Sequence, residues 1–84
     1  MDQAQARLNR SLRMSLILEI IEVSGKTGTT MDELAEQGGL KRSPYLAQIV
    51  RDLISLGCIG ERLERNHTGR AVAVFLFVKP YEPA

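Results

Sequence analysis

The clearest pattern of apolar and polar positions lies between residues 43 and 57, and it predicts one amphipathic helix. Its start is marked by Ser43, whose hydroxyl can cap a helix, and by Pro44, which suits the first helical position. Its end is marked by Gly57, which tolerates the left-handed conformation of a helix terminus. At about 100° per residue, the apolar face comprises Leu46, Ile49, Val50, Leu53, Ile54 and Leu56, and the opposite face comprises Pro44, Tyr45, Gln48, Arg51, Asp52 and Ser55.

The apolar pattern of residues 7–24 predicts a long first helix that stops at Gly25. One stripe consists of Leu8, Leu12, Leu16, Ile20 and Val23. A second set extends the apolar character around the helix and consists of Met14, Ile17, Leu18 and Ile21. A helix that is apolar over most of its circumference must be covered on more than one side. Either the fold wraps this helix by itself, or the second set forms the interface of a homodimer.

The remaining segments are predicted from their turn and capping residues. Residues 25–29 form a tight connection with room for a very short strand. Thr30 and Glu33 fit a capping box at the start of a second helix over residues 31–37, which Gly38 ends. Residues 59–65 and 71–78 have strand-like content and are joined by a turn at 66–69, so they predict a hairpin. We expect a single domain over residues 1–84, with flexible tails at 1–6 and 80–84.

Composition places the chain among globular proteins but says little of its partner. Of the 84 residues, 44% are hydrophobic and 25% charged, and the net charge is only +1. The charges are unevenly distributed, because residues 15–40 hold one lysine against five acidic residues, whereas residues 41–70 hold six basic residues against three acidic ones. Cys58 is the single cysteine, which fits a reducing compartment. Without a signal-peptide pattern or a long apolar run, we expect a cytoplasmic protein that does not bind membranes.

Motifs for catalysis and metal binding are incomplete in this chain. Gly25 and Lys26 imitate the end of a phosphate-binding loop, but Ile20 stands where the first glycine is required. One cysteine and one histidine do not make a zinc site. No nucleophile has a plausible base, and Glu61 and Glu64 have the pattern of solvent-facing strand charges. We therefore expect no enzyme, no catalytic residue, no metal, no cofactor and no small-molecule substrate.

The predicted order of helix, short strand, helix, turn, helix and hairpin resembles the winged helix-turn-helix domain of bacterial and phage DNA-binding proteins. The resemblance rests on the capped opening at 30–35, the turn at 40–46, the helix that ends in Leu-Gly-Cys-Ile at 56–59, and the hairpin tip at 67–70. It spans about residues 8–78. It implies an α+β fold with three helices and a C-terminal β-hairpin wing.

The resemblance also implies which residues contact double-stranded DNA. The third helix would enter the major groove, where glutamine suits adenine, arginine suits guanine and serine suits either. The expected base contacts are Ser43, Tyr45, Gln48 and Arg51. The expected contacts to phosphate or the minor groove are Thr30, Lys41, Arg42, Arg62, Arg65, His67 and Arg70. Asp52 lies on the same helix face, where phosphate repels it unless it orients Arg51 or Gln48 or accepts a hydrogen bond from cytosine.

Two functions remain as hypotheses. The first is a small transcriptional regulator that binds specific DNA sequences as a homodimer. The second is a winged helix that binds another protein, as an inhibitor or adaptor of a nucleic-acid enzyme or a repressor. The near-zero net charge, the acidic second helix and the apolar first helix are compatible with the second hypothesis.

Overall fold

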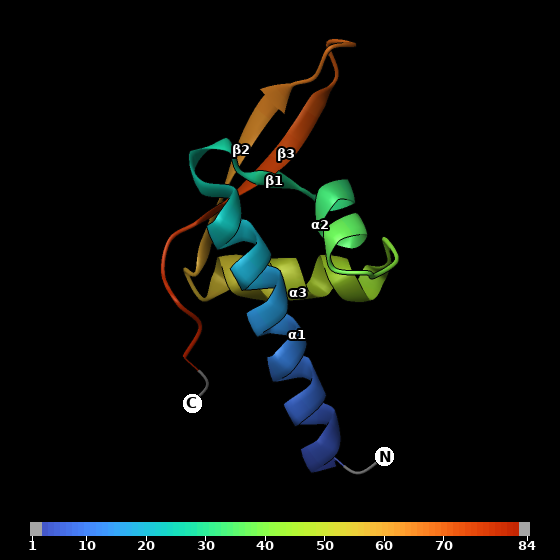
Figure 1. The fold of residues 1–84 in the computed structure, drawn as a ribbon, viewed down its shortest axis with the longest axis vertical. Helices are drawn as coiled ribbons and strands as arrows, with labels where there is room; N and C mark the ends of the chain where they lie inside the picture. Colours follow the sequence, from blue (N-terminus) through green and yellow to red (C-terminus); the bar gives the residue numbers. More distant parts are fainter. Residues whose placement is uncertain (1–2, 83–84) are drawn as a thin grey trace.

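The computed structural model describes residues 3–82 and confirms the predicted α+β class (Figure 1). This part of the chain contains three α-helices and one three-stranded antiparallel sheet. In chain order the elements are α1 (Gln3–Ser24), the 3₁₀ turn η1 (Gly25–Thr27), β1 (Thr29–Thr30), α2 (Met31–Gln37), α3 (Pro44–Ser55), β2 (Ile59–Arg65) and β3 (Ala71–Phe77).

Helix α3 has the bounds and the terminal chemistry that its sequence predicts. The Ser43 hydroxyl accepts a hydrogen bond from the backbone N–H of Leu46 at 3.3 Å, and Pro44 occupies the first helical position. Gly57 follows the helix with a φ of 76°, a conformation that favours glycine. These local signals fix both ends of the helix without help from distant residues.

The sheet has the strand order β1-β3-β2. Strand β1 pairs with β3 through Thr29 opposite Phe75, so the short strand before the second helix is present. Strands β2 and β3 pair from Ile59 opposite Phe77 to Arg65 opposite Ala71. The hairpin rises away from the helices, and its tip lies at the opposite end of the molecule from the start of α1 (Figure 1).

The core lies where the three helices meet the base of the sheet, and it corrects the prediction for α1. Its buried side chains are Met14, Ile17, Leu18 and Ile21 from α1, Leu34 from α2, Leu46, Ile49, Val50 and Leu53 from α3, and Cys58, Ile59 and Phe75. The four α1 residues are at most 5% exposed within one chain, so their assignment to a dimer interface is wrong. The fold wraps this stripe by itself.

The other apolar stripe of α1 faces solvent instead. The exposed fractions are 54% for Leu8, 61% for Leu12, 41% for Leu16 and 81% for Val23. Only Ile20 of this stripe packs partly against the core. Helix α1 therefore presents one apolar face to the core and a second one to the outside.

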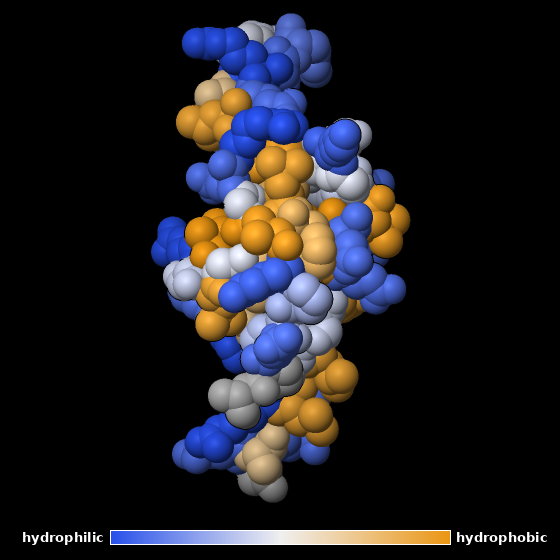
Figure 2. Space-filling model, turned by 90° about the vertical axis from the view of Figure 1, so that its left-hand side faces the viewer, coloured by the Kyte–Doolittle hydropathy of each residue, from blue (hydrophilic) through white to orange (hydrophobic). Residues whose placement is uncertain are grey.

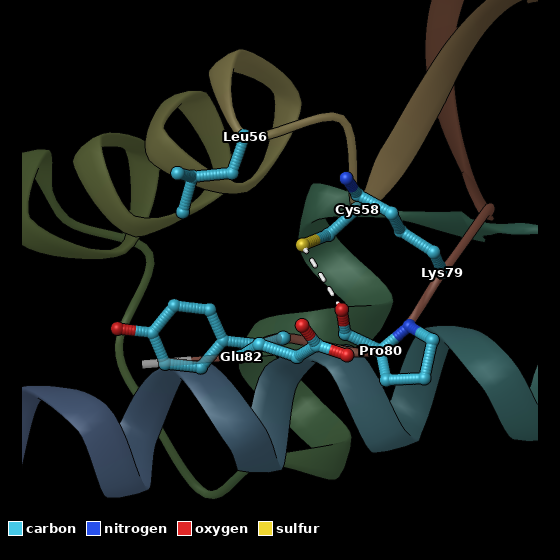
Figure 3. A pocket seen from close by; sticks show the side chains of 6 residues that line it. Leu56, Cys58, Lys79, Pro80 and Glu82 are labelled. Atoms are coloured by element: carbon cyan, nitrogen blue, oxygen red, sulfur yellow. Dashed lines mark hydrogen bonds between the residues drawn. The ribbon is translucent and has the colours of Figure 1, made fainter. Parts of the chain in front are cut away.

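Helical structure and core contacts extend into both segments that were expected to be tails. Residues 3–6 belong to α1, while residues 1–2 lie outside the described part. At the other end Tyr81 packs against the core, while residues 83–84 lie outside the described part. The Cys58 thiol donates to the backbone carbonyl of Pro80 at 3.7 Å and holds this segment beside α3 and α1 (Figure 3). Between residues 3 and 82, no helix has both the length and the apolarity to cross a bilayer.

Candidate nucleic-acid interface

The outward face of α3 carries three of the residues predicted to contact bases. Burial of Leu46, Ile49, Val50 and Leu53 fixes the rotation of the helix. This rotation leaves Tyr45, Gln48 and Arg51 exposed to solvent. Ser43 differs from them, because it is half-buried and its hydroxyl is the cap of the helix.

Asp52 is held between two side chains of this surface. Its Oδ1 accepts a hydrogen bond from Gln48 Nε2 at 2.9 Å. Its Oδ2 forms an ion pair with the guanidinium of Arg10 on α1. Of the roles considered for Asp52, the structure thus shows the orientation of Gln48, one turn earlier on the same helix.

Arg10 is the residue of this surface that the sequence analysis missed. It stands 42 positions before Asp52 in the chain, and the packing of α1 across α3 brings the two together. The side chains are 37% and 34% exposed, so water screens the pair and its contribution to stability is of the order of 1 kcal/mol or less. The one signal in the sequence was the carboxylate of Asp52 on a helix face that was expected to contact phosphate.

A groove lies between the start of α2 and the hairpin and gathers three further predicted residues, Thr30, Arg42 and Arg70. Its volume is about 520 Å³. The acidic residues Asp32 and Glu61 also line it, so its charges are mixed. Arg42 is tied to Asp32 at 2.7 Å, but both side chains are largely exposed, which makes this ion pair weak and open to competition.

Thr30 has a structural role that occupies its polar atoms. The hydroxyl accepts from the backbone N–H of Glu33 at 3.2 Å and donates to the Glu33 carboxylate at 3.0 Å. The backbone N–H of Thr30 donates to the same carboxylate at 3.1 Å. This is the predicted capping box, and it places a negative charge at the start of α2. Thr30 is therefore not among the proposed phosphate contacts.

The tip of the hairpin is held by Asn66. Its Oδ1 accepts from the Thr68 backbone N–H at 3.0 Å, from the Thr68 hydroxyl at 2.6 Å and from the Arg70 backbone N–H at 3.0 Å. Arg65 donates to the carbonyl of Gly69 at 2.8 Å and leaves its charge unneutralised. His67 is exposed at the turn. The tip is therefore an ordered basic loop.

Arg62 is separated from these cations. Successive side chains of a strand point to opposite faces, so Arg62 lies on the face of β2 opposite to Glu61 in the groove. It is also paired with Glu64. Lys41 is exposed in the connection between α2 and α3 and, like Arg51, has no hydrogen-bond or ion-pair partner among residues 3–82. The predicted site therefore divides into a helix face, a groove, a hairpin tip and one outlying arginine.

A second hollow, of about 400 Å³, lies between the end of α3 and the C-terminal segment (Figure 3). Its lining comprises Leu56, Cys58, Lys79, Pro80, Tyr81 and Glu82. None of the predicted contact residues lines it. In the described part of the chain, histidine, cysteine, aspartate and glutamate also form no group of three that could bind a metal ion.

Comparisons of the chain with models of protein families, with curated proteins and with solved structures gave no match. The fold defines a small α+β domain in which one face of α3 is polar and exposed and the tip of the β2–β3 hairpin is basic.

Proposed function

We propose that this protein is a winged helix-turn-helix domain that binds double-stranded DNA with sequence preference and regulates transcription. The observation that carries the proposal is the rotation of α3, whose buried stripe directs Tyr45, Gln48 and Arg51 to solvent. Helices α2 and α3 are the helix-turn-helix, and the β2–β3 hairpin is the wing. The order of elements and the β1-β3-β2 sheet are consistent with this fold.

Gln48 and Arg51 are the base-contacting residues in this proposal. The Gln48 amide has two hydrogens, of which Asp52 accepts one. The second hydrogen and the carbonyl oxygen remain for N7 and N6 of adenine, and Asp52 fixes the plane in which they are presented. Arg51 keeps its full fork of donors for O6 and N7 of guanine.

The backbone contacts are Lys41, Arg42 and the cations of the wing tip, Arg65, His67 and Arg70. Phosphate competes with Asp32 for Arg42, because their ion pair is exposed to water. Each cation that neutralises a phosphate releases counterions, so the affinity falls as salt rises. These contacts position the domain on the duplex, and the face of α3 distinguishes its sequence.

The test begins with selection of bound duplexes from a random pool, followed by binding titrations of the selected site and a scrambled site. We expect Arg51→Ala to reduce the preference for the selected site, and Arg70→Ala to weaken both sites alike and to reduce the salt slope by about 0.9. Lys26→Ala is the matched control, because Lys26 is an exposed cation in η1 outside the proposed interface. Equal effects of Arg51→Ala and Arg70→Ala on preference would contradict the assigned roles.

The second candidate function is a winged helix that binds another protein. It is favoured by the acidic side chains of Asp32 and Glu61 in the groove and by the exposed apolar stripe of α1. Salt dependence separates the two functions, since a DNA-binding domain must retain duplex DNA at about 50 mM salt. Absence of DNA retention under this condition would overturn the proposal and leave the protein-binding function.

A further inference from the structure

Strand β2 is an edge of the sheet, and no strand of the described residues lies on its outer side. The order β1-β3-β2 leaves this side of β2 unpaired. Residues 61–65 are all exposed, and the hairpin that contains them rises away from the helices (Figure 1). Figure 2 views the molecule from this side and shows a mainly hydrophilic hairpin with an apolar group between its hydrophilic side chains. A free strand edge is a template for pairing with a further strand.

The hydrogen bonds of the hairpin show which backbone groups of β2 face this edge. The Asn66 N–H donates to the Arg70 carbonyl at 3.0 Å, and the Val78 N–H donates to the Cys58 carbonyl at 2.8 Å. Hydrogen-bonded and non-hydrogen-bonded pairs alternate along an antiparallel ladder. The even-numbered residues of β2 therefore bond to β3, and the backbone N–H and C=O groups of the odd-numbered residues point to the free edge.

The side chains of β2 are complementary to those of a second, antiparallel copy of the same strand. The sequence from residue 61 to residue 65 is Glu-Arg-Leu-Glu-Arg. One register places Leu63 opposite the partner's Leu63. It also places Glu61 opposite the partner's Arg65. Arg62 then lies opposite the partner's Glu64. The odd-numbered residues meet one another in this register, so each of their pairs exchanges two backbone hydrogen bonds.

The charges of β2 also disfavour the neighbouring alignments. Moving the centre of an antiparallel pair by one residue places Arg62 opposite the partner's Arg62, or Glu64 opposite the partner's Glu64. A two-fold symmetric parallel pair places every charged residue opposite its own copy. Like charges directly opposite each other on two strands are destabilising, whereas opposite charges stabilise the pair. The charges on this edge therefore protect it against most alignments but favour the one centred on Leu63.

We infer that two copies of this chain form a homodimer in which their β2 strands pair antiparallel, centred on Leu63. Such an interface is isologous and joins two three-stranded sheets into one continuous sheet. Glu61 and Arg65 have no ion-pair partner among residues 3–82 of one chain, and each gains one from the second copy. Leu63 is 70% exposed in one chain and is covered by its own copy. The other sheet edge, β1, has only two residues, so pairing stops at the dimer.

The inference goes beyond the proposed function and changes it at one residue. In the dimer Arg65 faces the partner's Glu61, so His67 and Arg70 remain as the wing-tip cations for phosphate. Association is measured without DNA, so the two proposals fail separately. A monomer that binds specific DNA would remove the dimer and leave the proposed function. A dimer that does not retain DNA at low salt would do the reverse.

The first experiment measures molar mass by light scattering from about 1 to 500 µM protein, a range that spans ordinary homodimer affinities. We expect the mass of the unmodified chain to double across this range. Glu61→Arg and Arg65→Glu should each remain monomeric, because each symmetric pair would contain like charges at two places. Lys26→Glu is the matched control, since this charge reversal lies in η1 and should leave the dimer intact.

An equimolar mixture of Glu61→Arg and Arg65→Glu should recover the dimer, because positions 61 and 65 of the two chains again carry opposite charges. Circular dichroism of each variant checks that the fold is retained. A monomer at every concentration of the unmodified chain would overturn the inference. Failure of the mixture to recover a dimer that both folded variants had lost would overturn the register.

The second experiment tests the register by disulfide crosslinking. Paired residues that exchange hydrogen bonds have Cα atoms about 5.5 Å apart, which lies within the disulfide range of about 4.4–6.8 Å. Leu63→Cys should therefore crosslink to its own copy on mild oxidation. Glu61→Cys is the matched control, because its two copies lie four residues, or about 13 Å, apart along the strands. Cys58 is buried and does not compete. No crosslink of Leu63→Cys, or equal crosslinking of both variants, would overturn the register centred on Leu63.

Discussion

Replacement of Gly28 by alanine tests how closely β1 and β3 approach each other in the structure. Gly28 has a φ of 76° and a ψ of −179°, a combination that residues with a side chain rarely adopt. A Cβ at this position would lie 2.3 Å from Cγ1 of Val74, 3.0 Å from the carbonyl oxygen of Phe75 and 3.2 Å from Cδ2 of Leu76. The new methyl group has no room unless the strands separate.

The expected loss of stability has two parts. Forcing this backbone conformation on alanine costs about 1–3 kcal/mol. Overpacking against Val74 and the backbone of Phe75 costs about 1–3 kcal/mol more. The sum is about 2–6 kcal/mol, whereas a chain of 84 residues has a total stability of about 4–13 kcal/mol. Gly28→Ala should therefore unfold a substantial part of the population or lower the urea midpoint sharply.

Gly25→Ala is the matched control, since it carries a backbone cost without an overpacking cost. Gly25 also has a positive φ, of 61°, but no heavy atom lies within 4 Å of its Cβ position. Only the left-handed backbone is penalised there, at about 1–2 kcal/mol. For equal backbone costs at the two glycines, urea unfolding followed by circular dichroism should place Gly28→Ala about 1–3 kcal/mol below Gly25→Ala, which is the overpacking cost. Equal stabilities of the two variants would refute the close approach of Gly28 to β3.

Two further substitutions test the core and the α3 surface. Thr29 is 1% exposed and its hydroxyl has no hydrogen-bond partner within residues 3–82. Thr29→Val should therefore raise the free energy of unfolding by about 1 kcal/mol. A lower free energy of unfolding in thermal unfolding experiments would show that the hydroxyl is hydrogen-bonded. Asp52→Asn keeps an acceptor for Gln48 but removes a negative charge and releases Arg10 from its ion pair. On the proposed function, this variant should bind duplex DNA several-fold more tightly and keep its sequence preference. Weaker binding of this variant in the same titrations would show that the carboxylate itself is required.

The elements that the sequence predicted best are those whose ends are set by neighbouring residues. Ser43, Pro44 and Gly57 specify α3 through contacts within a few positions, and Thr30 and Glu33 do the same for α2. Each of these signals is local chemistry, so no knowledge of the tertiary structure is needed to interpret it. The order of elements and the α+β class follow from such signals.

Features that depend on long-range packing were not predictable in the same way. Both stripes of α1 are periodic and apolar, and their residue types do not say which one faces α3. Met14 and Ile17 are buried, whereas Leu8 and Leu12 are exposed, because of the way in which α3 and the sheet pack against α1. Tyr81 was missed for the same reason, because Pro80 indicates the end of regular structure and not where the chain goes next.

Three acidic residues affect the surface charge differently once their partners in the structure are known. In the sequence, Asp52 and Glu64 lower the net positive charge of residues 41–70, and Asp32 adds to the negative charge of residues 15–40. In the structure each is paired with an arginine, namely Arg10, Arg42 and Arg62 in that order.

Three cations of the surface proposed to bind DNA, Lys41, Arg51 and Arg70, have no ion-pair partner among residues 3–82. Lys41 precedes α3, Arg51 lies two turns into this helix, and Arg70 lies between the hairpin turn and β3. Three to five phosphate contacts per chain give a salt slope of about −3 to −5, which is modest for a specific DNA-binding protein. On the proposed function, a single domain would therefore bind duplex DNA weakly at physiological salt, and its affinity would fall less steeply with salt than that of a protein with more phosphate contacts.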